Sequence, residues 1–446
     1  MLAWLGFGMV ITFMTLIMTR RLSPLVALIG VPVLFALLGG FETAQLGEMM
    51  LDGLRTLAPT GVMLMFAILY FGLIIDAGLF DPLVTAVVRV VGADPLKVVV
   101  GTALLAALVS LDGDGSTTFM ITVAAMLPLY RRLRMNPLNL TCVTILASGV
   151  MNLTPWGGPL ARAASALHVE PAAVFVPMLP AMAAGLAGVF GLAWLLGRRE
   201  KRRLAHLSLS AAATEEASIV DSALVPPQAS SDTVRRPKLL ALNALLTLLL
   251  LVALVLGVLP LPVLFMVGFA LALVMNYPKV ADQRERIAAH AKNVIAVVSL
   301  IFAAGVFTGI LGGTGMLDAM AQSVLGLVPP SLGPYFAPIT ALLSLPFTFF
   351  VSNDAFYFGV IPIVAQTASE FGISPVEIAR ASLIGQPVHL LSPLVPSTYL
   401  LVGLAGVEFG DHQRFTLKWA VLICLLMLIA ALVCAVFPLH GPASPP

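Results

Sequence analysis

The chain has 446 residues, of which 59% are hydrophobic and only 10% are charged, and its formal net charge is +2. Its mean hydropathy is +1.03. Soluble globular proteins carry about 25% charged residues, so this composition excludes a soluble fold and indicates that lipid is the solvent. The few charges form short clusters, and nothing in them indicates nucleic-acid binding.

The first apolar stretch, residues 1–18, precedes its positive charges, Arg20 and Arg21. A signal peptide has the reverse order, with basic residues before the apolar run. We therefore expect an uncleaved first span whose N-terminus lies outside the cell.

Three cysteines, Cys142, Cys424 and Cys434, lie within apolar runs. None belongs to a CxxC pattern or to a Cys/His pair with metal-ligand spacing. We interpret them as small buried hydrophobic residues and expect neither a disulfide nor a structural metal site.

Ten segments are long and apolar enough to cross a bilayer as helices, since a crossing takes about 20 residues. We place them near residues 2–19, 23–40, 58–79, 138–166, 172–197, 239–258, 260–277, 293–312, 376–402 and 416–437. Pro260 and Pro262 divide a long uncharged run into two of these crossings. The expected fold is an all-α polytopic membrane protein.

Clusters of basic residues test this topology, because cytoplasmic loops are rich in Lys and Arg. They are Arg20/Arg21, Arg131/Arg132/Arg134, residues 198–203, Arg235/Arg236/Lys238, residues 279–292 and Arg414/Lys418. All these clusters lie on the cytoplasmic side if the N-terminus is outside the cell and residues 96–131 enter and leave the membrane by the same face. We expect a multi-pass protein of the inner (cytoplasmic) membrane, with both termini outside and a charged, then polar, linker 198–238 inside.

Two apolar segments are interrupted by polar residues. Asp112-Gly-Asp-Gly-Ser116 breaks residues 96–131, and Ser352-Asn-Asp354 breaks residues 335–370. A helix with such a break cannot simply span a bilayer, because freed backbone groups need partners there. Each segment is predicted to form a re-entrant hairpin with its polar tip at membrane depth.

The two halves of the chain, 1–197 and 239–446, resemble each other weakly but in order. Gly72 to Asp81 resembles Gly309 to Asp318 at an offset of 237 residues, and Asp114 corresponds to Asp354. Because each half has five spans, the second copy is inverted relative to the first. Inverted repeats are typical of alternating-access transporters.

Such transporters bind their solute near the midplane, where broken helices expose backbone groups. Besides the two hairpin tips, two predicted spans are broken by prolines and glycines, which free helical amides and carbonyls. These broken spans are residues 138–166, interrupted at Asn152–Pro159, and residues 376–402, interrupted at Gln386–Thr398.

Asp112, Asp114 and Asp354 lie well inside apolar segments. An ionised Asp at the bilayer centre costs about 2.5–3.5 kcal/mol on insertion scales, so we interpret the three as metal- or proton-coupling groups. The alternative role is helix N-capping. His389, in the second broken span, is a candidate for carrying a coupling proton, and a merely hydrogen-bonded histidine is the alternative.

Arg162 follows the first break, where it could pair with a substrate carboxylate, snorkel outward or pair with a protein Asp. Other groups at the breaks suit neutral coordination of carboxylates or a hard cation. These candidates are Ser116, Thr117, Asn152, Thr154, Gly157, Asn353, Ser392, Ser397 and Thr398. Singly, Ser and Thr hydroxyls in a membrane helix usually bond back to their own helix. Glu408, Asp411 and His412 are expected to face water near a span end.

The candidate site therefore has at least three acidic residues and at most one arginine. A bare multivalent anion would be repelled by it, whereas a cation or a metal–anion complex would not. An anion that enters with protons is also compatible, because buried carboxylates take up protons more readily.

The residues Leu111-Asp-Gly-Asp-Gly-Ser-Thr-Thr-Phe119, continuing through Met126–Tyr130, are similar to the signature of the CitMHS family, the divalent-metal–citrate:proton symporters. The likeness extends to residues 152–159, 386–400 and 410–415, and it covers nearly the whole chain outside the linker. It implies uptake of citrate complexed with Mg²⁺, or with Ca²⁺ and heavier ions, driven by protons. No resident cofactor is implied, since the metal travels with the substrate.

The resemblance also implies the ion-transporter superfamily architecture: two inverted repeats, each with a re-entrant hairpin and a broken helix, usually assembled as a homodimer. Many superfamily members are sodium-coupled and have Ser-Asn-Thr tips. Here the tips read Asp-Gly-Asp-Gly-Ser-Thr and Ser-Asn-Asp. This departure puts sodium sites in doubt and suits a metal-laden substrate.

Three alternatives remain open at this point. One is a cation:proton antiporter, metalloid exporter or other carboxylate transporter of the same superfamily. Another is an intramembrane aspartyl protease using Asp114 and Asp354, but Leu111 stands where the Gly-x-Gly-Asp pattern of those enzymes has its first glycine. A passive channel explains the repeat poorly. We expect a transporter and not an enzyme.

Overall fold

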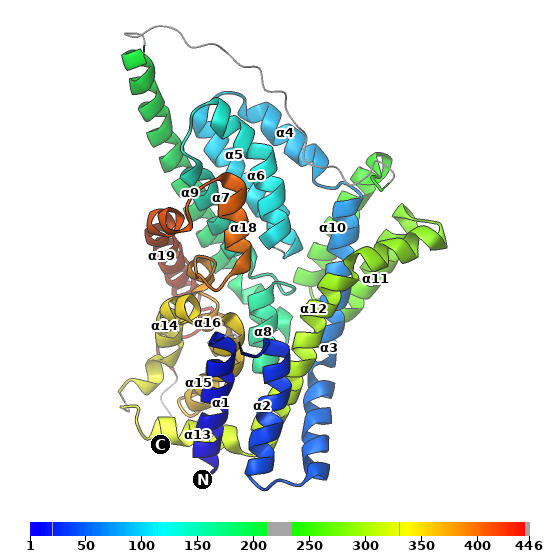
Figure 1. Ribbon diagram of the computed structural model, residues 1–446, viewed down its shortest axis with the longest axis vertical. Helices are drawn as coiled ribbons and strands as arrows, with labels where there is room; N and C mark the ends of the chain where they lie inside the picture. Colours follow the sequence, from blue (N-terminus) through cyan, green and yellow to red (C-terminus); the bar gives the residue numbers. More distant parts are fainter. Residues whose placement is uncertain (20, 114, 212–233, 330, 442–446) are drawn as a thin grey trace.

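The computed structural model describes residues 1–19, 21–113, 115–211, 234–329 and 331–441, and these are helical without any β-strand (Figure 1). The helices of the first half are α1 (Leu2–Met18), α2 (Pro24–Leu38), α3 (Thr43–Asp76), α4 (Asp81–Val91), α5 (Pro95–Val109), η1 (Ser110–Asp112), α6 (Gly115–Arg132), α7 (Pro137–Met151), α8 (Gly158–Ala166) and α9 (Pro171–Ala211). Asp114 lies outside the described residues, so its predicted role stays a prediction.

The second half follows from Pro237. Its helices are η2 (Pro237–Leu239), α10 (Leu240–Val255), α11 (Leu261–Asn276), α12 (Val280–Gly313), α13 (Met316–Leu325), η3 (Gly333–Tyr335), α14 (Phe336–Phe350), η4 (Ala355–Val360), α15 (Ile361–Ser369), α16 (Pro375–Ser382), α17 (Gln386–His389), α18 (Pro396–Ala405) and α19 (Phe409–Val433). Among the short helices of both halves, η4 is a π-helix, whereas η1, η2 and η3 are 3-10 turns.

Seven helices of the described residues are long and apolar enough to cross a membrane, which identifies an all-helical membrane protein. They are α3, α5 with η1, α9, η2 with α10, α12, η3 with α14, and α19. Six shorter apolar helices, among them α1, α2 and α11, accompany them. Helices α3 and α12 begin well before the predicted spans 58–79 and 293–312, because helix-forming residues such as Ala, Glu, Gln and Arg precede each apolar stretch.

Helix α9 continues to Ala211, into the segment expected to be linker from residue 198. The charged residues there are strong helix formers, and Glu200 forms an ion pair with Arg203 one turn later. The helix therefore outlasts the apolar stretch that marked the predicted span. Residues 212–233 of the predicted linker lie outside the described part of the chain.

Helix bounds in the two halves recur at nearly constant spacing. Helices α3 and α12 each have 34 residues and begin 237 residues apart, at Thr43 and Val280. Helices α7 and α16 begin 238 residues apart, as do α8 and α18. The sequence offset between glycine motifs is therefore repeated by the helices themselves.

The two predicted hairpins approach each other from opposite ends of the molecule (Figure 1). The α5–α6 pair descends from the end where the described part of α9 stops, and the α14–α15 pair rises from the end where α1 begins. Their tips and the interruptions of α7–α8 and α16–α18 meet near the middle. The packing of α7 against α5, α6, α17 and α18 holds these interruptions together.

Helices α3 and α12 form the other close-packed part of the fold. A Cβ at Gly53 would lie 2.0 Å from the carbonyl oxygen of Gly305, and one at Gly309 would lie 2.4 Å from that of Met49. The backbones of these helices therefore touch where they cross. Helices α2 and α11 pack against this pair, and α8 joins it to the elements around the breaks.

Candidate functional site

The first broken span is shaped by a tight turn between α7 and α8. The Gly157 amide donates a hydrogen bond to the Thr154 carbonyl at 2.8 Å. A Cβ at Gly157 would lie 2.1 Å from the carbonyl oxygen of Asn152, so the turn has room only for glycine there. Gly157 thus shapes the backbone, and α8 begins directly after it.

The second broken span consists of α17 and an irregular stretch before α18. The Ser392 hydroxyl donates to the Phe349 carbonyl at 2.6 Å and accepts from the Leu394 amide at 3.1 Å. The Thr398 hydroxyl donates to the Leu390 carbonyl. The Ser392 hydroxyl therefore satisfies a carbonyl at the end of α14 and an amide within the interruption, and the Thr398 hydroxyl satisfies a carbonyl within the interruption, as a buried chain requires.

The first hairpin tip is attached to the first broken span by Trp156. Its indole Nε1–H donates to the Leu111 carbonyl at 2.8 Å, and its ring contacts Phe71 and Phe265 with centroids 5.0 and 5.2 Å apart. Gly113 has φ +77°, a left-handed conformation that glycine adopts without strain. Asp112 is buried in this tip, with 9% of its surface exposed.

The second hairpin tip is attached to the second broken span by paired amides. Asn353 and Gln386 exchange hydrogen bonds at 3.4 and 3.3 Å, and Gln386 Nε2 also donates to the Tyr357 hydroxyl at 2.8 Å. The π-helix η4 follows the tip directly. Such irregular turns are frequent at functional sites.

All four interruptions line one cavity of about 390 Å³. An ion pair crosses its wall, with Arg162 Nε of the first half 2.6 Å from Asp354 Oδ1 of the second. Arg162 also donates from Nη1 to the Gly158 carbonyl at 2.9 Å. The open question about Arg162 is thereby answered for this conformation: it pairs with a protein carboxylate.

His389 lies in the cavity wall with its orientation fixed. Its Nδ1 is 2.6 Å from the Thr348 carbonyl oxygen. Because a carbonyl only accepts, Nδ1 must carry a proton, and Nε2 is the ring atom through which this residue can meet a ligand.

The structure brings six of the predicted site residues to the cavity wall: Asn152, Arg162, Asn353, Asp354, His389 and Ser397. Others lie in the same four breaks but outside the lining: Asp112, Ser116, Thr117, Thr154, Gly157, Ser392 and Thr398. Among the polar side chains of the lining, Ser148 and Ser352 were not predicted as ligands. Their positions in the sequence could have identified them, because Ser148 precedes Asn152 by one helical turn and Ser352 adjoins Asn353.

Three helices begin in the wall of this cavity. Gly115, Gly158 and Pro396 are the first residues of α6, α8 and α18, and all three line it. Unpaired amides and the helix dipole make an N-terminus favourable for negative charge. The wall therefore combines an arginine–carboxylate pair with three positively polarised helix ends.

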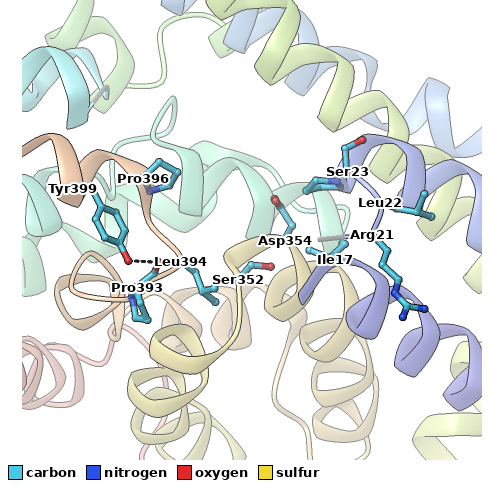
Figure 2. A pocket seen from close by; sticks show the side chains of 11 residues that line it. Ile17, Arg21, Leu22, Ser23, Ser352, Asp354, Pro393, Leu394, Pro396 and Tyr399 are labelled. Carbon is cyan, nitrogen blue, oxygen red and sulfur yellow. Dashed lines mark hydrogen bonds between the residues drawn. The ribbon is translucent and has the colours of Figure 1, made fainter. Parts of the chain in front are cut away.

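A larger space of about 870 Å³ continues from this cavity and shares Ser352, Asp354, Leu394 and Pro396 with it. Figure 2 shows Ser352 and Asp354 between Tyr399 on one side and the α1–α2 turn on the other. Arg21 of that turn directs its side chain away from Asp354. The central cavity thus opens toward the α1–α2 turn.

A family model described as "Citrate transporter", CitMHS, matches residues 13–385. The chain belongs to the citrate transporter family. The resemblance seen in the motifs is confirmed, and the protease alternative is set aside because the family and these relatives are transporters rather than enzymes.

Relatives from Bacillus subtilis (strain 168) match the chain of this citrate transporter family member over almost its full length. A citrate transporter is 57% identical over 97% of this chain and 98% of its own. A Mg(2+)/citrate complex secondary transporter is 52% identical with the same coverage. The uncharacterized transporter YraO is 49% identical, again over 97% and 98%.

Solved structures show the fold of this family member to be that of known transporters. The YdaH transporter of Alcanivorax borkumensis aligns with a TM-score of 0.55 and 16% identity, covering 88% of each chain. MtrF of Neisseria gonorrhoeae aligns with a TM-score of 0.56 and 14% identity, covering 90% of this chain and 86% of its own. At such identities the likeness concerns the fold alone.

Proposed function

We propose that the protein is a secondary transporter that takes up citrate as a complex with a divalent metal ion, coupled to protons. The observation that carries this proposal is the single cavity into which three helix N-termini and the Arg162–Asp354 pair point. Its volume of about 390 Å³ lies in the usual range for small-molecule sites, about 300–1,000 Å³. The names of two close relatives supply the substrate class.

The charges at the cavity wall favour a partly neutralised anion. Arg162 is already paired with Asp354, so the two side chains together add no net charge. The helix N-termini attract carboxylates but carry only partial charges of about half a unit each. Citrate has three carboxylates, and a bound Mg²⁺ or Ca²⁺ leaves the complex with one net negative charge, which these partial charges can balance.

We assign contacts within this site from the groups in its wall. The Asn152 and Asn353 amides and the Ser148 and Ser397 hydroxyls are placed to hold citrate oxygens, together with the amides at the start of α8 and α18. Hard divalent ions prefer oxygen ligands, and a metal ion bound to citrate still has coordination positions that other oxygen atoms can occupy. Asp354 and His389 are the described groups assigned to metal contact or to proton transfer.

The transport cycle we propose follows from the two opposed hairpins. They form inverted repeats, and the hairpins move with their broken spans relative to α3 and α12. The cavity opens toward the α1–α2 turn, which carries basic residues and is cytoplasmic in the expected topology. This conformation is therefore the inward-facing state of the proposed cycle.

Uptake of labelled citrate into proteoliposomes with an alkaline interior tests the function. We expect uptake only when Mg²⁺ or Ca²⁺ and the proton gradient are both present. Citrate uptake at the same rate with and without metal would contradict the proposal that citrate enters as a metal complex. No citrate uptake with any metal, combined with proton flux driven by a cation alone, would support the antiporter alternative instead.

The variant Asp354→Asn tests the site within the same assay. We expect it to lower metal-dependent citrate uptake at least about tenfold, or to make uptake independent of the proton gradient, because the carboxylate assigned to coupling is gone. Asp52→Asn is the matched control, since Asp52 is a surface carboxylate that pairs with Arg55. Full proton-coupled uptake by Asp354→Asn would refute the assigned role.

A further inference from the structure

The apolar parts of α9 and α19 end at the same level. Residues 171–197 of α9 are uncharged, and the five basic residues between Arg198 and Arg203 follow at once. Helix α19 is apolar from Ala420 onward and carries its charges before that point. The two helices pack together, and Arg199 Cζ lies 5.9 Å from the centroid of the Trp419 ring. Two independent hydropathy boundaries thus coincide and mark the membrane–water interface there.

At this level three cations surround two indole rings. We call this group of residues the tryptophan–cation patch: Trp194, Arg198, Arg199, Lys418 and Trp419. Lys418 Nζ lies 5.3 Å from the Trp419 ring centroid, so this ring has a cation from each helix. Arg198 Cζ lies 4.5 Å over the ring of Trp194, which is 47% exposed.

The positive charge of this patch is not compensated by the described part of the protein. Arg198, Arg199 and Lys418 are exposed, and none forms an ion pair with a described carboxylate. The neighbouring carboxylate, Glu200, is buried and engaged elsewhere: it accepts from the Asn136 amide at 2.8 Å and forms an ion pair with Arg203.

We propose that the tryptophan–cation patch binds the headgroup of an anionic phospholipid. A phosphate accepts hydrogen bonds from guanidinium and ammonium groups, and basic pockets between membrane helices on the cytoplasmic side suit such headgroups. Indole rings prefer this same level, with an apolar body toward the acyl chains.

A bound lipid at this place would act on the part of the fold that carries the cavity. Helix α19 contacts the second broken span directly, because Gln413 Nε2 donates to the Leu391 carbonyl at 2.7 Å. Helix α9 packs against α5 and α7. The lipid would therefore tie α9 to α19 on the linker side and stiffen the support of the breaks.

Native mass spectrometry of protein extracted from vesicles tests the proposal without reference to citrate. The vesicles contain phosphatidylcholine, alone or mixed with phosphatidylglycerol. We expect the wild type to retain phosphatidylglycerol selectively. The double variant R199Q/K418Q is expected to bind this lipid about fivefold more weakly for each cation removed, since one cation near an anionic surface contributes about 1 kcal/mol.

The matched control is R131Q/R132Q at the end of α6, which removes two exposed cations from the linker side without touching an indole. This control is expected to retain phosphatidylglycerol as the wild type does. Equal retention of phosphatidylglycerol by all three proteins would overturn the proposal. An equal loss in both double variants would also overturn it, because general surface charge would then account for the binding. A thermal unfolding midpoint in detergent close to that of the wild type shows that R199Q/K418Q is folded.

Discussion

The ion pair between Arg162 and Asp354 joins the two halves of the chain at the candidate site. The two side chains are 24% and 14% exposed, so water screens their attraction only in part. Arg162 belongs to α8, whereas Asp354 precedes the π-helix η4. A ligand carboxylate that binds Arg162 would have to displace Asp354, so in the proposed function the substrate and Asp354 compete for this arginine.

We predict that Arg162→Gln and Asp354→Asn are coupled in a double-mutant cycle of stability. Each single variant leaves a partly buried charge without its partner, and the interaction energy is expected at about 1–3 kcal/mol. Thermal unfolding in detergent measures it. The control cycle, Arg55→Gln with Asp52→Asn, removes a pair whose side chains are 75% and 70% exposed, and its coupling should stay below about 1 kcal/mol. Equal couplings in the two cycles would contradict the prediction.

Other site candidates differ in what their side chains do. Ser392 and Thr398 were predicted as substrate ligands because polar groups gather at the break, and the structure shows both hydroxyls bonded to backbone carbonyls. His412 was expected to face water near a span end. It is fully buried, with Nδ1 3.0 Å from the Thr141 hydroxyl. Sequence position cannot distinguish these cases because it does not say which helix face meets a neighbour.

Helices α3 and α12 cross in close backbone contact. Glycines from both helices allow it, because no side chain separates Gly53 from Gly305. In a bilayer, close backbone approach of this kind replaces the hydrophobic effect as a source of helix association. The pair can therefore serve as the rigid support for the hairpins in the proposed transport cycle.

We predict that Gly53→Ala destabilises the protein by about 1–3 kcal/mol, because its Cβ would overlap the Gly305 carbonyl and force the helices apart. Gly47→Ala, on the same helix, has open space around it and should stabilise by about 0.5–1 kcal/mol through helix propensity. Thermal unfolding midpoints in detergent compare the two. A Gly53→Ala variant as stable as Gly47→Ala would show that the crossing is not close-packed.

On the scale of the whole molecule, the described chain ends lie at one extremity and the end of α9 at the other. Met1 begins α1 near α13, and the Gly441 amide donates to the Pro334 carbonyl at 2.6 Å, which brings the end of the described chain to the same extremity (Figure 1). The two described chain ends therefore lie on the side opposite to the end of α9, and the expectation that the termini face outside stays a prediction.

Thiol labelling checks that topology. With Cys434, the exposed native cysteine, replaced by Ser, a cysteine at Ala44 in the first turn of α3 should react with a membrane-impermeant maleimide in intact cells. A cysteine at Ala205 near the end of α9 should react only in inside-out vesicles. Both positions are exposed in the structure. Labelling with the opposite sidedness would invert the proposed orientation and, with it, the inward-facing assignment.

The sequence by itself determined the solvent of this protein, its helical class, its family and the four places where helices break. These follow from local chemistry: apolar length sets the spans, and clusters of Gly, Pro and polar residues mark the breaks, whereas single prolines such as Pro59 lie inside helices. Only the tertiary structure decided that Arg162 pairs with Asp354, that Ser148 joins the cavity and that Ser392 serves the backbone. Those outcomes depend on contacts between residues up to about two hundred positions apart, which are fixed by packing and leave no local signal.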